Sequence, residues 1–86
     1  MDQTAFRKVF VDVMLLHTKD GSKRPCAVIF EDGQRYEIDQ LIARKRAAAS
    51  KVGGTGIRYT IRIQNHQTFL FEDDDKWFVE AHNLHS

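Results

Sequence analysis

The chain has 86 residues, of which 42% are hydrophobic and 29% charged, and its formal net charge at pH 7 is +1. This composition predicts one small globular domain over residues 1–86 and excludes a disordered chain or a fibrous repeat. The near-neutral balance argues against an obligate nucleic-acid binder. With Cys26 as the single cysteine, the chain forms no internal disulfide and no cysteine-based zinc site, which fits a reducing cytoplasm.

The N-terminal region resembles the start of a secretory peptide, because Arg7 and Lys8 precede an apolar run at residues 9–16. Asp12 interrupts this run, and no small-residue cleavage site follows it. The run is also far too short to cross a bilayer. We therefore expect a cytoplasmic protein that does not enter a membrane.

Alternation of apolar and polar residues predicts a mainly β fold, a small antiparallel sheet or barrel of five to six strands. The clearest strand is 57–64, in which Arg58 and Arg62 share one face. The Asp32-Gly33 pair predicts a two-residue hairpin turn with Ile29 opposite Tyr36. The predicted strands are 7–17, 25–31, 34–45, 57–64, 68–72 and 77–81.

The hairpin registers also predict a core and a second apolar face. A turn at residues 65–66 places Ile61 opposite Leu70, and the acidic turn that follows places Phe71 beside Phe78. Both faces carry large apolar groups, which favours a sheet curled into a small barrel or crossed by the N-terminal strand. The residues expected to be mostly buried are Tyr36, Ile38, Tyr59, Ile61, Leu70 and Val79.

The segment 39–52 has two interpretations. Its Ala, Leu, Arg and Lys content favours a helix, with Asp39 as N-cap and Gly53 just past the end, which would make the fold α+β. The alternative is a long bent strand that continues from Tyr36. Propensity alone does not choose between them.

Several short motifs in this chain are found together in a known group of domains. They are Arg35-Tyr36, Ala48-Ala49-Ser50-Lys51, Gly53-Gly54-x-Gly56-Ile57-Arg58-Tyr59-Thr60, Leu70-Phe71-Glu72 and Trp77-Phe78-Val79-Glu80. Through them the chain resembles a group of small uncharacterised bacterial β domains. More distantly, it is similar to a small β domain appended to DNA-repair proteins of the translesion-polymerase type. The resemblance covers roughly residues 24–80, implies a mainly β fold and favours the bent strand.

No pattern in the sequence predicts catalysis or a cofactor. The glycines at residues 53–56 are followed by Ile57 and a strand, whereas a phosphate-binding loop ends in Gly-Lys-Ser/Thr and opens a helix. Glycines at a strand entrance more often mark a bulge or a positive φ. The histidines are scattered, and the acids at 72–75 lack the spacing of a calcium loop. We therefore expect no enzyme activity, no metal and no cofactor.

Charge is segregated along the chain. Residues 40–71 contain no acid, whereas residues 72–80 contain five acids and one lysine. Basic residues beside aromatic ones are typical of a surface that contacts phosphates and stacks on bases. The candidate nucleic-acid-binding residues are Arg44, Lys45, Arg46, Lys51, Arg58 and Arg62. The alternative is that the acidic hairpin neutralises these cations within the fold.

These observations predict a small non-enzymatic binding module. The first hypothesis is that an apolar sheet face binds a protein partner or a second copy of the chain. The candidate residues of that face are Val28, Phe30, Phe71 and Phe78. The second hypothesis is an accessory nucleic-acid-binding domain that uses the basic segment 44–62.

Overall fold

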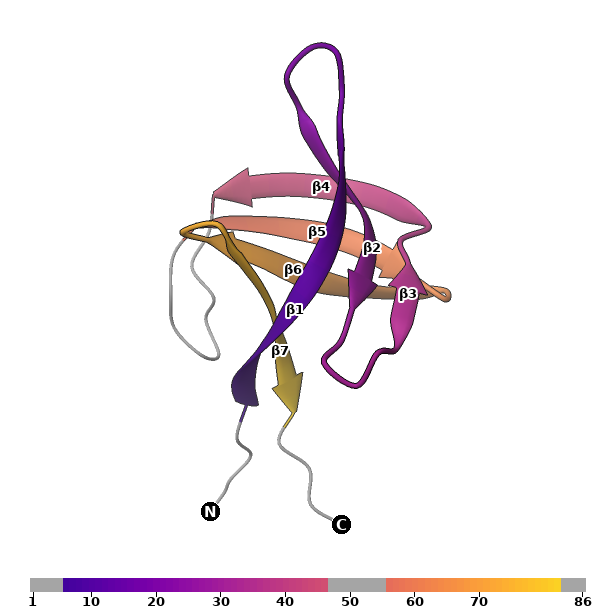
Figure 1. Cartoon of the computed structure of the whole chain (residues 1–86), viewed down its shortest axis with the longest axis vertical. Helices are drawn as coiled ribbons and strands as arrows, with labels where there is room; N and C mark the ends of the chain where they lie inside the picture. The colour runs from indigo at the N-terminus through magenta and orange to yellow at the C-terminus, as the bar shows by residue number, and fades with distance from the viewer. Residues whose placement is uncertain (1–5, 47–55, 83–86) are drawn as a thin grey trace.

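A computed structural model describes residues 6–46 and 56–82 (Figure 1). These residues are mainly β, as predicted, and contain no helix. The strands are β1 (Phe6–His17), β2 (Lys23–Ile29), β3 (Arg35–Glu37), β4 (Gln40–Arg46), β5 (Ile57–Ile63), β6 (His66–Asp73) and β7 (Lys76–His82). In this part of the chain there is accordingly no helix that could span a membrane.

The seven strands form one antiparallel sheet in the order β3-β2-β1-β7-β6-β5-β4, curved into a half-barrel (Figure 1). The two outermost strands, β3 and β4, are separated in the chain by only Ile38 and Asp39. The amide of Ile38 donates to the carbonyl of Cys26 in β2 (2.9 Å), and the amide of Asp39 donates to the carbonyl of Arg62 in β5 (2.8 Å). The chain thus passes directly from one end of the sheet to the other.

This passage corrects two predictions about the segment after the Asp-Gly turn. The single strand predicted at 34–45 is divided into β3 and β4, so the sheet has seven strands rather than five or six. The helix predicted as the alternative at 39–52 is wrong for its described part, because residues 40–46 pair with β5. This pairing satisfies the backbone and packs Leu41 against the core, which outweighs local helix propensity. Residues 47–52 lie outside the described residues.

The turns explain where the predicted registers hold and where they shift. At the Asp-Gly turn, the Gly33 amide donates to the Phe30 carbonyl and the Phe30 amide donates to the Gln34 carbonyl, which makes the loop three residues long. Gly33 has a φ of +89°, as expected of the last residue of such a loop. Val28 therefore opposes Tyr36, and the predicted opposition of Ile29 to Tyr36 is wrong.

The two later hairpins have two-residue turns. Gln64 and Asn65 have φ values of 50° and 66°, so Tyr59 opposes Leu70, where Ile61 was predicted. Because this shift is of two residues, each side chain keeps its predicted face. The pairing of Phe71 with Phe78 is as predicted.

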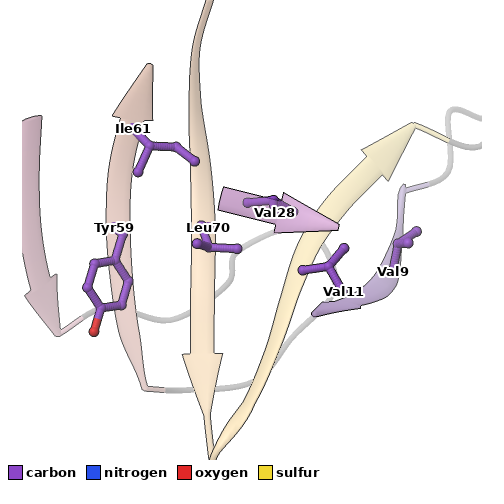
Figure 2. Close-up of a cluster of buried hydrophobic side chains, with 6 residues drawn as sticks. All are labelled: Val9, Val11, Val28, Tyr59, Ile61 and Leu70. Carbon is purple, nitrogen blue, oxygen red and sulfur yellow. The ribbon is translucent and has the colours of Figure 1, made fainter. Parts of the chain in front are cut away.

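The main core lies on the inner face of the curved sheet. Figure 2 shows its six buried side chains, which come from β1, β2, β5 and β6: Val9, Val11, Val28, Tyr59, Ile61 and Leu70. The predicted burial of Tyr59, Ile61 and Leu70 is confirmed, whereas Tyr36, Ile38 and Val79 are half-buried. Phe71 and Phe78 form a separate, smaller buried cluster, and the register places them on the outer face.

Candidate functional site

A row of five side chains crosses the outer face of the sheet. The register places Lys45 of β4 opposite Arg58 of β5, and Arg58 opposite Phe71 of β6. Phe71 in turn opposes Phe78 of β7, and Phe78 opposes Phe10 of β1. Because directly opposed residues of an antiparallel sheet project to the same face, two cations and three aromatic rings share this row.

The aromatic rings of the row are in mutual contact. The rings of Phe71 and Phe78 stack with centroids 5.2 Å apart and an interplanar angle of 10°, and Phe10 meets Phe78 at 5.9 Å and 65°. Phe69, two residues before Phe71, lies 6.5 Å from the Phe71 ring. Phe71 and Phe78 are buried, but Phe10 is 54% and Phe69 38% exposed. The cluster therefore presents one exposed ring at each end of a stacked, buried pair.

Cations lie over the rings of this face. The guanidinium carbon of Arg58 is 4.6 Å from the centroid of Phe69, and the ammonium nitrogen of Lys8 is 4.6 Å from the centroid of Phe78. Both distances are within the range of cation–π attraction. We call this surface the aromatic–cation face and define it by Lys8, Phe10, Lys45, Arg58, Arg62, Phe69, Phe71 and Phe78.

Neither arginine of β5 has an acid directly opposite it on the neighbouring strands. Arg62, on the same face as Arg58, opposes Gln40 of β4 and Gln67 of β6. Both arginines are half-buried, and the Nε atom of each is buried without a hydrogen-bond partner within the described part of the chain.

The other cations of β4 lie on the inner face. Arg44 opposes Tyr59, with its guanidinium 5.8 Å from the Tyr59 ring, and Arg46 opposes Ile57. Both line a cleft of about 400 Å³ at the rim of the half-barrel, together with Lys23 and the four acids of residues 72–75. Here the basic segment does face the acidic hairpin, as the alternative interpretation of the charges proposed.

Glu72 is the buried acid of this rim. Its Oε2 accepts a hydrogen bond from the Lys23 ammonium at 2.8 Å, and its Oε1 accepts one from the Tyr59 hydroxyl at 3.2 Å. The hydrogen bond to Glu72 raises the pKa of Lys23, and burial raises the pKa of Tyr59. These contacts connect β2, β5 and β6 and indicate a structural role for Glu72.

The structure thus separates the residues that were predicted as sites. Of the six candidate nucleic-acid-binding residues, Lys45, Arg58 and Arg62 share the outer face, Arg44 and Arg46 lie on the inner one, and Lys51 lies outside the described residues.

The four candidates for protein interaction are also divided between the two faces. Val28 is 1% exposed in the main core, and Phe30 packs against that core with its ring 5.6 Å from that of Tyr36. Only Phe71 and Phe78 lie together on the outer face.

Two aromatic residues of the face were missed by the sequence analysis. Phe10 joins it through the pairing of β1 with β7, and Phe69 through its position two residues before Phe71. The signal for Phe69 was the alternation along β6, whereas no local signal identifies Phe10.

Gly56, at the entrance to β5, has a structural role. Its φ is +140°, and a Cβ atom there would collide with the carbonyl oxygen of Glu72. This agrees with the expected positive φ at a strand entrance, whereas Gly53 and Gly54 lie outside the described residues. Among the residues that the structure describes, no group of three His, Cys, Asp or Glu side chains could hold a metal ion.

Comparisons with protein-family models, with curated proteins and with solved structures give no match. The function is therefore inferred from the geometry of the aromatic–cation face.

Proposed function

We propose that this protein is a non-enzymatic module that binds single-stranded nucleic acid on its aromatic–cation face. The observation that carries the proposal is the continuous row from Lys45 through Arg58, Phe71 and Phe78 to Phe10, which combines cations and rings on one surface. Nucleic-acid surfaces need both, because cations contact phosphates and rings stack on bases.

Exposed rings on a sheet favour a single strand over a duplex. A duplex keeps the flat faces of its bases inside the stack, whereas a single strand presents them to aromatic side chains. Phe69 and Phe10 are the exposed rings. Phe69 contacts Phe71 and Phe10 contacts Phe78, so the buried pair lies between them. Each stacked base contributes roughly 1–3 kcal/mol to binding of this kind.

The arginines supply the phosphate contacts. Arg58 and Arg62 are four residues apart on β5, so their α-carbons are separated by roughly 13 Å at the usual rise of a strand. This separation lets them contact different phosphates of one strand. A guanidinium group donates charge-assisted hydrogen bonds to phosphate oxygens.

Fluorescence anisotropy with a labelled oligothymidine tests this function. We expect binding at low salt, and the logarithm of the binding constant should fall linearly with the logarithm of the salt concentration, with a slope of about −0.7 per phosphate contacted. A duplex of equal length should bind more weakly. Absence of binding at low salt, or preference for the duplex, would contradict the proposal.

Protein binding is the second candidate function. Phe10, Met14 and Leu16 are 54%, 46% and 49% exposed and share one face of β1. They favour a protein contact at a different place from the one predicted with Val28 and Phe30.

A further inference from the structure

The C-terminal half of β1 has a partner on only one side. Residues 6–11 pair with β7, whereas residues 12–17 pair with β2. β7 lies on the other side of β1 from β2, but its pairing stops at Val11. On that side, no strand of the described chain pairs with residues 12–17. In Figure 1 the β1–β2 hairpin extends beyond the rest of the sheet, so this half of β1 presents the backbone of an edge strand.

This edge has few of the features that protect edge strands from pairing. Native edges are commonly blunted by lysine, proline or a bulge. The sequence of residues 12–17 is Asp-Val-Met-Leu-Leu-His, with neither lysine nor proline. The bulge of the hairpin lies in β2, because Met14 opposes Ala27 and Leu15 opposes Pro25, which leaves Cys26 as the extra residue. The open side of β1 is therefore regular.

Exposed apolar side chains line the same segment. Met14 and Leu16 are 46% and 49% exposed, and together with Phe10 they project to the outer face. A two-stranded hairpin is only marginally stable by itself in water. A strand paired with this edge would satisfy its open backbone groups and would bring cross-strand contacts to its exposed apolar side chains.

We propose that this edge pairs antiparallel with the same edge of a second copy of the chain, which gives a two-fold symmetric dimer with a continuous sheet. A two-fold axis normal to the sheet requires one residue to oppose itself. With Met14 on the axis, Asp12 opposes Leu16 of the second copy, and Val13 opposes Leu15. A register centred on Leu15 would instead place Val13 against His17. Both registers pair apolar residues on both faces, so the Met14 register is favoured by the cleft beside Asp12.

The shape of the surface beside the edge matches this register. A cleft of about 690 Å³ opens where β7 leaves β1, lined by Phe10, Val11, Asp12, Val13, Asp75, Lys76 and Trp77. Leu16 of the second copy, opposite Asp12 and diagonal to Phe10, would reach this partly apolar cleft. Five residue pairs make a small interface, so the dimer is expected to be weak and dependent on concentration.

Sedimentation velocity of the protein without nucleic acid tests the dimer. We expect the sedimentation coefficient to rise from the monomer value to the dimer value between about 5 and 500 µM. Leu16→Lys should remain monomeric throughout. Because Leu16 is exposed, the circular dichroism spectrum of the variant should match that of the parent. A parent protein that stays monomeric at the highest concentration, or a variant that dimerises equally, would overturn the proposal.

Disulfide trapping tests the register. In a Cys26→Ser background, Met14→Cys should form a disulfide-linked dimer on mild oxidation, because directly opposed residues have α-carbons about 4.5–5.5 Å apart. Leu16→Cys is the matched control, since in this register the two copies of residue 16 are displaced by four residues, roughly 13 Å. Trapping of Leu16→Cys as fast as Met14→Cys, or no trapping of Met14→Cys, would contradict the proposed arrangement.

Discussion

At the entrance to β5, the backbone of Glu72 approaches Gly56 so closely that only glycine fits there. Any side chain there would combine a φ of +140° with a collision against the Glu72 carbonyl. We expect Gly56→Ala to lower the free energy of unfolding by clearly more than about 1 kcal/mol, measured by urea denaturation. Gly33→Ala is the control, because Gly33 also has a positive φ, +89°, but nothing lies within 4 Å of its added Cβ. Equal losses in the two variants would show that the collision is relieved by movement of β6.

Ile61 tests the position of the core. It is 1% exposed and packs with Tyr59 and Leu70 on the inner face. Ile61→Ala should lower the free energy of unfolding by about 2–5 kcal/mol, because its neighbours close the resulting cavity only in part. Ile42→Ala serves as the comparison, since Ile42 is 40% exposed. Similar melting temperatures for the two variants would be inconsistent with a core centred on Ile61.

Between the elements, the contacts of Glu72 with Lys23 and Tyr59 predict loss of stability at alkaline pH. The pKa of Lys23 is raised from 10.5 and that of Tyr59 from 10.0, so both groups hold their protons more tightly in the folded state. Their contribution is complete below pH 10, the lower of the two unfolded-state values, and is lost as pH rises through the folded-state pKa values. Urea denaturation at a series of alkaline pH values should show this decline. It should be shallower in Lys23→Met, and an unchanged pH dependence in that variant would argue against the role of Lys23.

The elements also show where sequence reasoning succeeds. Alternation identifies β5, because its side chains meet a core on one face and a different surface on the other. The Asp-Gly pair correctly predicts a hairpin, but it does not show whether the loop has two or three residues. The loop has three residues, so the register differs from the predicted one by one residue. β4 is strand despite its helix propensity because pairing with β5, a contact distant in sequence, decides it.

For the whole molecule, the sequence predicts only part of the candidate site. Alternation placed Arg58, Arg62, Phe71 and Phe78 on one face, and the register agrees. It did not place Arg44 and Arg46 on the opposite face, because the structure of residues 39–52 was undecided. Phe10 joins the face only through pairing of the first strand with the last, which no local pattern reveals.

Binding of nucleic acid to the outer face can be tested with two double variants that carry the same net charge. Arg58→Gln with Arg62→Gln removes two cations from the aromatic–cation face, whereas Arg44→Gln with Arg46→Gln removes two from the inner face. By anisotropy with oligothymidine at low salt, we expect the first variant to bind at least about tenfold more weakly and to reduce the salt slope by about 1.4, the value for two phosphates. The second variant should bind within about twofold of the parent. Equal losses in both would show that only overall charge matters and would contradict the proposed site.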